Sequence, residues 1–353
     1  MKIDKFIERF SRQIILNNIG VKGQIKLFNS RVAIIGCGAT GTAVAELLAR
    51  AGIGFIRVVD RDFVELSNLH RTHLFTEKDV LDNMPKALSC KQHLNEISKF
   101  VDVEYIIENV SSDNIRDIIK DVDLVIDGTD NLETRFLINE ASIELKKPWI
   151  MIGVERWYGM TKFINVERGA CLKCFIHRND RRHENVCETI GVTNVAVSLT
   201  TSIAASLALK YLLGLDVEDD LFIIDAYNIT VERIKVNKNP NCSVCVRREF
   251  NLLNRKIVDR ARILCGVNVV EVLPEKAIKI DITRIEKCSI FNKVKIFDKF
   301  AYMMIKDVEI ILLSNGKALI RGTTDTNFAE NLYNQIFNEL IKLNAIQNTN
   351  YKE

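Results

Sequence analysis

Apolar residues recur at roughly helical spacing along the first 28 positions of the chain. The pattern runs from Ile3 to Phe28 and predicts an amphipathic helix with one buried face. Gly20 and Gly23 interrupt this pattern. We therefore expect residues 1–30 to form an N-terminal helical arm.

A continuous apolar run at residues 31–35 predicts a short buried strand of the kind found in parallel sheets. Residues 42–52 then predict a helix that ends at Gly52, and residues 55–60 predict a second strand. This order of strand, helix and strand has the length of a βαβ unit.

Strand and helix patterns continue to alternate as far as residue 154. The expected elements are strands at 101–107, 123–128 and 148–154 and helices at 86–98, 112–119 and 132–146. Alternation of this kind predicts an α/β fold, Rossmann-like and doubly wound, with a mostly parallel sheet.

The pattern is less regular between residues 154 and 250. Residues 192–214 are apolar but are broken by Thr, Ser and Asn, so they predict a buried helix rather than a membrane-spanning one. Residues 221–236 predict a hairpin or one long strand.

Beyond residue 245 the character of the chain changes. Residues 246–256 are highly charged and predict a linker. A hairpin with Asn315 and Gly316 at its turn, followed by an amphipathic helix at 327–343, predicts a small α+β unit.

The chain has 353 residues, of which 47% are hydrophobic and 27% are charged, with a net charge of +3. This composition is typical of soluble globular proteins, and we divide the chain into the arm, a main domain of residues 31–250 and an extension of residues 251–353. The net charge is too small to indicate binding to nucleic acid or to a membrane surface. The first residues lack the apolar core of a signal peptide, so we expect a cytoplasmic protein.

The segment "GCGATG" at residues 36–41 follows the first strand and fits the pattern G-x-G-x-x-G. Gly36 would make the tight turn, Gly38 would let a ligand approach the backbone, and Gly41 would let helix and strand pack closely. The helix that begins here favours an anion, and Asp60 at the end of the second strand can accept hydrogen bonds from ribose hydroxyls. These features predict a nucleotide site, and a packing turn without ligand is the alternative.

Further polar residues follow the strand ends and exceed what NAD requires. They are Asp62, Asn68, Arg71, Lys86, Asp127 and Asp130. Ligands collect at the carboxyl edge of such sheets. Cations near phosphates, with a carboxylate placed to hold Mg²⁺, suit chemistry at a triphosphate and favour ATP. Taken singly, each of these residues could instead be a solvated surface side chain.

Nine cysteines, an odd number in a chain expected to be cytoplasmic, argue against a disulfide framework. Four of them form two C-x-x-C pairs, Cys171 with Cys174 and Cys242 with Cys245. Two such pairs can supply the corners of a Zn²⁺ tetrahedron, and the long gap means that the site would join distant segments. The alternative is four unconnected thiols.

Cys187 stands alone in "HENVCETIGV", after a stretch that contains several arginines. Nearby cations can lower the pKa of a thiol and make it a nucleophile. A packing or solvent-facing cysteine is the alternative, and the spacing alone favours it. The remaining cysteines, Cys37, Cys90, Cys265 and Cys288, lie in apolar or helical contexts that predict core positions.

The order of the motifs resembles the ubiquitin-activating-enzyme-like superfamily, in its ThiF/MoeB/HesA branch of sulfur-carrier adenylyltransferases. The motifs are "RFSRQIIL", "IIGCGATG", "DRDFVELSNLHR", "PKA", "DGTDN", "CLKC", "CETIGV" and "NPNCSVC", within residues 5–246. The resemblance implies binding of MgATP and of a ubiquitin-like protein that ends in Gly-Gly. It also implies the reaction, in which AMP is joined to the terminal carboxylate and pyrophosphate is released.

The resemblance also implies roles for single residues. Asp60 would hold the ribose, Asp130 would help to bind Mg²⁺, and Asn68, Arg71 and Lys86 would contact the phosphates. Asp62 belongs to the same cofactor-binding loop.

Three further expectations follow from the resemblance. Arg12 would be an arginine finger that reaches the ATP of a partner subunit, so the chain would form a homodimer. The two cysteine pairs would bind zinc. Cys187 occupies the position where some relatives carry a thiol that takes up the activated carrier.

The sequence departs from the family pattern in places. "DVLDNMPK" is longer than the usual link before the lysine, which leaves the reach of Lys86 open. Thr72 follows Arg71 where relatives often have glutamine. The part after residue 250 is not rhodanese-like and resembles the small extension of some archaeal members.

Three other functions remain open at this stage. The same fold could activate a different carboxylate, on a peptide or a tRNA base. A NAD-dependent dehydrogenase would use the glycine loop but would leave the cysteine pairs and "DGTDN" without a role. A non-catalytic partner of an active relative would not need Arg12, Lys86 and Asp130.

Overall fold

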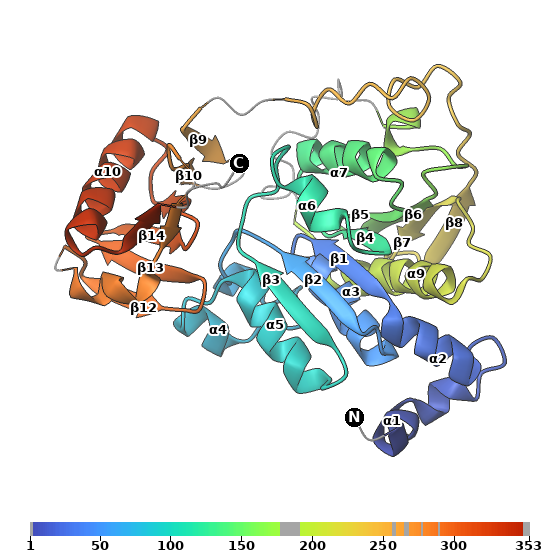
Figure 1. Cartoon of the computed structure of the whole chain (residues 1–353). Coiled ribbons are helices and arrows are strands. Elements are labelled where there is room, and N and C mark those ends of the chain that lie inside the picture. The colour runs from blue at the N-terminus through green and yellow to red at the C-terminus, as the bar shows by residue number, and fades with distance from the viewer. Residues whose placement is uncertain are drawn as a thin grey trace. The chain divides into compact units, whose positions relative to one another are not determined.

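The protein was analysed as a computed structural model that describes residues 3–176, 191–255, 259–264, 268–276, 278–288 and 290–348. The chain forms two compact units, one up to residue 256 and one from residue 257 onward (Figure 1). Each unit has its own sheet, so the two are described separately.

One eight-stranded sheet with the order β3-β2-β1-β4-β5-β6-β7-β8 forms the centre of the first unit. Neighbouring strands are parallel from β3 to β5 and antiparallel from β5 to β8. The strands are β1 (Arg31–Ile35), β2 (Phe55–Val59), β3 (Asp102–Ile106), β4 (Leu124–Asp127), β5 (Trp149–Glu155), β6 (Tyr158–Ile164), β7 (Leu221–Asp225) and β8 (Thr230–Ile234). The expected Rossmann-like α/β fold is confirmed, and the continuous apolar runs of β1 and β4 lie buried near its middle.

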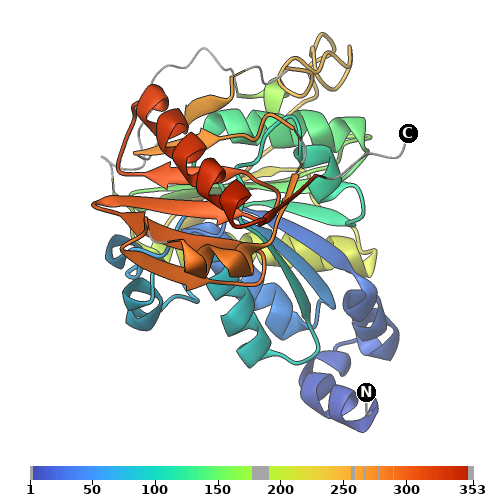
Figure 2. The ribbon, with the colours of Figure 1, turned by 60° about the vertical axis from the view of Figure 1, so that its left-hand side comes forward.

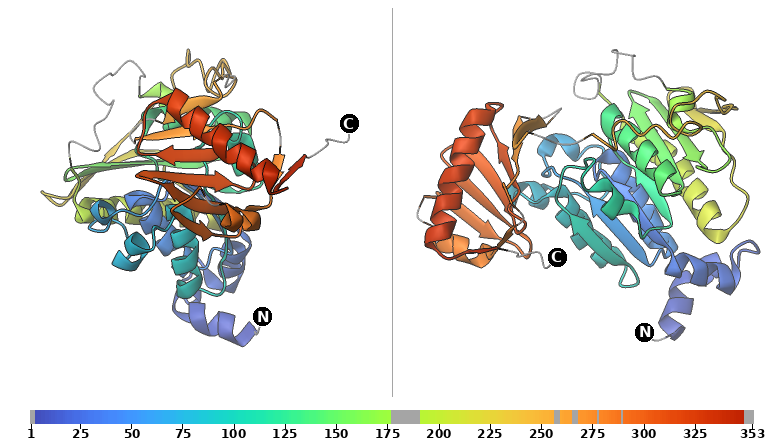
Figure 3. Two further views of the ribbon diagram at one scale, coloured as in Figure 1. Left: turned by 90° about the vertical axis from the view of Figure 1, so that its left-hand side faces the viewer. Right: turned by 45° about the horizontal axis from the view of Figure 1, so that its top comes forward.

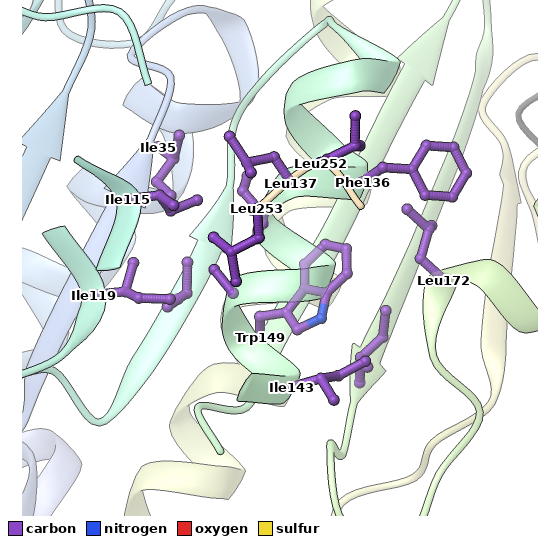
Figure 4. Close-up of a cluster of buried hydrophobic side chains, with 14 of the residues drawn as sticks. Ile35, Ile115, Ile119, Phe136, Leu137, Ile143, Trp149, Leu172, Leu252 and Leu253 are labelled. Carbon is purple, nitrogen blue, oxygen red and sulfur yellow. The ribbon is translucent and has the colours of Figure 1, made fainter. Parts of the chain in front are cut away.

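Helices cover both faces of this sheet. On one face α3 (Ala39–Ala51) packs between α5 (Lys86–Ile97) and α9 (Asn194–Leu213). On the other face α6 (Ile115–Ile119) and α7 (Leu132–Glu144) enclose a core that surrounds the buried Trp149 (Figure 4). The sheet is therefore doubly wound, as the alternating pattern predicts.

The helix α9 has 20 residues and is apolar enough, by length and composition alone, to cross a membrane. In the structure it packs on α3 and against β5 and β6. Close packing is visible at Gly159 of β6, where any Cβ would clash with the side chain of Thr200. The expectation of a buried helix at this position is confirmed by these contacts.

The N-terminal segment forms two helices, α1 (Ile3–Ile14) and α2 (Gly20–Asn29). Gly20 has a φ of 60° and begins α2, as expected for an interruption. Gly23, however, lies inside α2, so the expectation that it breaks the helix is wrong. A Cβ at Gly23 would lie 2.9 Å from Cδ2 of Leu213, so this glycine lies in close contact with α9.

The segment expected to be a linker is instead attached to the first unit. Phe250, Leu252 and Leu253 are buried in the core that surrounds Trp149. The backbone N–H groups of Leu252 and Leu253 both donate to Oε2 of Glu140 on α7, each at 2.9 Å. Although the segment contains several charged residues, the burial of its three apolar residues fixes it to the first unit.

The second unit contains a six-stranded antiparallel sheet with the order β12-β13-β14-β15-β10-β9 and a two-stranded sheet of β11 and β16 (Figure 2). Its elements are β9 (Ala261–Leu264), β10 (Val269–Val272), β11 (Ile278–Ile280), η4 (Ile282–Lys287), β12 (Lys293–Ile296), β13 (Phe300–Ile305), β14 (Val308–Leu313), β15 (Ala318–Arg321), α10 (Thr326–Lys342) and β16 (Ile346–Asn348). The helix α10 lies across the larger sheet (Figure 3). The expected α+β extension is thus confirmed.

The predicted hairpin of this unit is also present. The strands β14 and β15 pair antiparallel, and the N–H of Leu313 donates to the carbonyl of Lys317 at 2.9 Å. Gly316 has a φ of 86°, a backbone conformation that explains why glycine stands at the turn.

Candidate nucleotide site and cysteine cluster

Three neighbouring strands end at one edge of the sheet. The register aligns the last residue of β1, Ile35, with Val59 at the end of β2 and with Asp127 at the end of β4. The next residues along the chain, Gly36 and Asp60, therefore lie side by side at this carboxyl edge. The structure in this way brings the glycine loop and the aspartates of two strands together.

The three loop glycines have different reasons to be glycine. Gly36 has a φ of 88°, and a Cβ on it would lie 2.5 Å from the carbonyl oxygen of Gly128. A Cβ on Gly41 would clash with the carbonyl oxygen of Gly36. At Gly38, which caps α3, a Cβ would meet no described atom within 4 Å. Packing explains the first two glycines, whereas open space for a ligand is the remaining explanation for Gly38.

The carboxylate of Asp60 fastens the glycine loop to the end of β2. Its Oδ2 accepts from the N–H of Cys37 at 2.6 Å, and its Oδ1 accepts from the N–H of Asp62 at 2.7 Å. Burial raises the pKa of Asp60, while the charge of Lys86 and these two amides act in the opposite direction. Each oxygen keeps a further lone pair that can accept from a ligand hydroxyl.

Lys86 is the first residue of α5 and reaches the same edge of the sheet. Its Nζ lies 3.2 Å from Oδ2 of Asp62, and its side chain is only 14% exposed. Burial lowers the pKa of Lys86, but the charges of Asp62, Asp60 and the exposed Asp130 raise it by more. Lys86 therefore carries its charge at neutral pH and sits among three carboxylates.

The long link before Lys86 does not displace it. The link contains α4 (Glu77–Leu81), and Phe63 forms an isolated antiparallel bridge with Pro85. Asp79 joins the two helices, because it accepts from Oγ of Ser89 at 2.7 Å and lies 2.9 Å from Nε2 of His93. The extra residues include α4. The bridge between Phe63 and Pro85, together with the contacts of Asp79 with α5, fixes the position of Lys86.

Asn68 is the last residue of the short helix η1 (Leu66–Asn68), and Arg71 lies three residues beyond it. Asn68 is buried, and its Oδ1 accepts from the N–H of Glu65 at 3.2 Å. Arg71 is half-buried, and its guanidinium donates to the carbonyl oxygen of Ser67 at 2.6 Å. Asn68 thus shapes the loop in this structure, while the long side chain of Arg71 is held only by its own turn.

Asp127 lies at the end of β4 as its motif suggests, but its carboxylate is paired inside the protein. It is fully buried, and its Oδ2 accepts from Nε of Arg135 at 2.5 Å. Arg135 also donates to the carbonyl oxygens of Thr129 and Ile152. The pair positions the loop that carries Asp130. Arg135 belongs to no recognised motif, and its place one turn into the helix that follows "DGTDN" is the signal available in the sequence.

Arg12 lies at the opposite edge of the sheet. The neighbouring Gln13 donates to the carbonyl oxygen of Ala51 at 2.8 Å, just before β2 begins. The strand β2 has five residues and spans roughly 15 Å, so Arg12 is far from Asp60 in the same chain. Arg12 is exposed and lies at the far end of β2 from the nucleotide site of its own chain.

The four paired cysteines form a compact cluster. Their sulfur atoms all lie within 4.8 Å of one another, with 3.6 Å between Cys171 and Cys242, 3.6 Å between Cys174 and Cys245, and 3.9 Å between Cys171 and Cys174. A Zn²⁺ ion with four sulfur ligands at about 2.3 Å needs sulfur atoms about 3.8 Å apart. The cluster therefore fits a tetrahedral metal ion.

The ionisation of the cluster points to the same chemistry. Hydrogen bonds led by that from Cys171 lower the pKa of Cys245 to about 5, against the effect of burial. Burial and the neighbouring sulfurs raise the pKa of Cys174 to about 11, although the N–H of Asn239 donates to it at 3.4 Å. Four neighbouring thiols cannot all ionise unless a cation offsets their charge.

The sequence of this chain matches a known protein family over most of the first unit. The model of the ThiF family matches residues 10–244, a range that contains the nucleotide site and three of the four clustered cysteines, with Cys245 one residue beyond its end. The chain belongs to the ThiF family.

Curated relatives extend this match beyond the family domain. The ThiF-family chain is 32% identical over 331 residues to the sulfur carrier protein ThiS adenylyltransferase of Bacillus subtilis, which covers 93% of this chain and 98% of the relative. That length exceeds the first unit, so the match continues into the second. A sulfur carrier protein adenylyltransferase of Thermus thermophilus is 34% identical, covering 68% of this chain and 90% of the relative.

Solved structures agree with the fold. The Escherichia coli protein MccB, solved with ATP, has a TM-score of 0.60 and is 23% identical, over 67% of this chain and 73% of that protein. At this level of identity the match shows the α/β fold of the ThiF-family chain, not its substrate.

Cys187 lies outside the described residues, so its predicted role stays a prediction. Of the cysteines expected in the core, Cys37, Cys90 and Cys288 are buried, and Cys265 is likewise outside the described residues.

Proposed function

We propose that this ThiF-family chain uses ATP to adenylylate the C-terminal carboxylate of a small sulfur-carrier protein that ends in Gly-Gly, with release of pyrophosphate. The observation that best supports this proposal is the grouping of Lys86, Asp62 and Asp130 beside a glycine loop with open space at Gly38. The relative from Bacillus subtilis, named as an adenylyltransferase of a sulfur carrier, supports the choice of substrate.

The charges of the site suit attack on the α-phosphorus. The carrier carboxylate is already ionised, so no general base is needed, but it brings negative charge to a negative phosphate. Lys86, with Asn68 and Arg71, offsets this repulsion and stabilises the pyrophosphate as the bond between the α- and β-phosphates breaks. Asp60 accepts from the ribose hydroxyls.

Mg²⁺ is the second expected cofactor. Asp130 would hold it, and the bound ion would offset part of the triphosphate charge. Lys86 already pairs with Asp62 in the structure, so binding of MgATP exchanges this internal pairing for contacts with phosphate oxygens.

A structural Zn²⁺ in the cysteine cluster is a further part of the proposal. The ion joins the segment of Cys171 and Cys174 to that of Cys242 and Cys245, and the sulfur separations fit its geometry. It takes no part in the transfer of AMP.

We also propose a homodimer in which Arg12 of one chain acts at the nucleotide site of the other. The N-terminal segment supports this, because several of its apolar side chains are exposed, with Ile3 of α1 at 72% and, between α1 and α2, Ile15 at 70% and Leu16 at 50%. Mixing Arg12→Ala with Lys86→Ala chains tests it. Each variant alone should be inactive, whereas a mixed dimer contains one intact composite site and should recover activity.

Cys187 is proposed to accept the activated carrier in a later step, with the thiolate replacing AMP on the carrier carbonyl. We further propose a cytoplasmic location, with neither a membrane nor a nucleic acid as partner.

The test is ATP–pyrophosphate exchange with each small Gly-Gly protein from the same genome. Exchange should depend on one carrier, should vanish when that carrier lacks its terminal glycine pair, and should vanish in Asp130→Ala. Exchange that depends instead on a peptide or a tRNA would move the assignment to another carboxylate.

A further inference from the structure

Lys162 on β6 is buried in an unusual way. Its side chain is completely inaccessible to solvent, and its Nζ has no hydrogen-bond partner among the residues that the structure describes. A buried ammonium without partners is costly, because it loses its hydration and receives no hydrogen bond in return. A lysine at such a position therefore needs a nearby negative charge that stabilises its ammonium group.

The strand register places this lysine beside the cysteine cluster. Lys162 pairs with Met151 of β5 and with Leu221 of β7, so the three side chains share one face of the sheet. Met151 and Leu221 belong to the same core as Cys171 and Cys174, which also contains Trp149 and Leu172 (Figure 4). The ammonium is thus in the layer that holds the four sulfurs.

Two carboxylates and the sulfur of Cys174 act electrostatically on Lys162. Burial lowers its pKa, and Asp219, Asp220 and Cys174 oppose that effect. Asp220 already accepts from Arg233 at 2.9 Å. The described carboxylates therefore supply incomplete compensation for the buried charge.

We propose that the ammonium of Lys162 is a built-in counter-charge for a tetrathiolate metal centre formed by the four cysteines. Four thiolates around one Zn²⁺ carry a net charge of −2, and this charge lies in a low-dielectric core where an ammonium is worth most. The inference rests on the proposed zinc site and adds an outer residue to it.

The proposal predicts opposite effects of Lys162→Met on the stability of the metal-free protein and on the affinity for zinc. Methionine is chosen because it keeps a long unbranched side chain. The metal-free protein should become more stable, because a buried charge is replaced by an apolar group of similar volume. The metal centre should become weaker, by about 10- to 100-fold in zinc affinity, because outer-shell partners commonly contribute this much. A lysine that served only to fill space would change both forms in the same direction.

The experiment uses the full chain with zinc content measured first. Chelator competition then compares the wild type, Lys162→Met, Lys162→Arg and the control Lys147→Met, whose Nζ donates to the carbonyl oxygen of Val122. We expect weaker binding only in Lys162→Met, with recovery in Lys162→Arg, which keeps the positive charge. Co²⁺-substituted protein gives a second readout, because loss of the ammonium should shift the thiolate-to-cobalt charge-transfer band to longer wavelength.

The outcomes separate the two proposals. A wild-type chain that binds neither zinc nor cobalt overturns the zinc site and this inference with it. A wild-type chain that binds zinc, together with a Lys162→Met variant of unchanged affinity and unchanged cobalt spectrum, overturns the role of Lys162 alone.

Discussion

The nucleotide site and the cysteine cluster belong to the same unit but solve opposite electrostatic problems. At the strand ends, charges of both signs already pair with each other, and the side chains of Lys86 and Asp62 are 14% and 32% exposed. In the cluster, groups of one kind are gathered in the core, where Cys171 is 1% and Cys242 is 3% exposed. The first arrangement is already charge-balanced without ligand, whereas in the second the four thiols can all ionise only beside a cation.

This difference indicates how each region works. Pairs at a partly exposed site can exchange partners when a charged ligand arrives, which suits a substrate that must enter and leave. Buried thiolates around a cation cannot exchange without unfolding their surroundings, which suits a permanent clip between distant segments. The following predictions test this division, beginning with the largest effect.

Cys242→Ser should strongly destabilise the first unit. Loss of a metal ligand in the core should lower the free energy of unfolding by roughly 4 kcal/mol or more, measured by urea unfolding. Cys90→Ser, at another buried cysteine of this unit, is the control and should cost about 1–3 kcal/mol. Equal losses in the two variants would argue against a metal in the cluster.

Lys86→Ala should abolish most of the chemistry while leaving the metal in place. We expect pyrophosphate exchange to fall about 100- to 1,000-fold, because a charge that stabilises the transferred phosphate is lost. The zinc content should stay at the wild-type value. Lys99→Ala, at an exposed lysine just beyond the same helix, is the control. If Lys86→Ala lost zinc as well, the two regions would not be separable in the way described.

Glu140→Gln should have an intermediate effect on stability alone. The carboxylate receives two backbone N–H groups, from Leu252 and Leu253, and an amide replaces part of this acceptor with a donor. We expect a loss of about 1–3 kcal/mol in thermal or urea unfolding. Glu144→Gln, which weakens the partly exposed ion pair with Arg116, should cost about 1 kcal/mol or less.

His93→Gln should give a small effect that depends on pH. The hydrogen bond to Asp79 raises the pKa of His93 above its ordinary value. The pair therefore adds stability that is fully present below the unfolded pKa of histidine, about 6.5, and is lost as the pH rises through the higher folded value. The stability difference between wild type and variant, about 1 kcal/mol near pH 6, should shrink above that folded pKa. A difference that grows toward high pH would contradict this pairing.

Much of the first unit could be predicted from the sequence because its strands are continuous apolar runs and its site follows strand ends. Gly36, Asp60 and Lys86 were identified in this way, and the hairpin at Gly316 follows from local turn chemistry. Features set by distant packing could not be predicted. Gly23 lies inside a helix and packs against Leu213 of α9, a contact that the local pattern does not contain.

Two further failures have the same physical origin. Residues 246–255 look like a linker because charged residues are frequent among them, yet the backbones of Leu252 and Leu253 are bound by a glutamate more than 100 residues away. Lys162 looks like an ordinary strand lysine, and only the pairing of β6 with β5 and β7 places it in the cysteine core. Long-range pairing of this kind leaves no local signal.

The most direct test of the central claim is the transfer of label from ATP to the carrier. The chain is incubated with a Gly-Gly carrier and with ATP labelled either at the α-phosphate or at the γ-phosphate, beside Lys86→Ala. The account predicts that label from the α-phosphate alone reaches the carrier, and that it fails to do so in the variant. Transfer of the γ-phosphate, or undiminished transfer by Lys86→Ala, would contradict it.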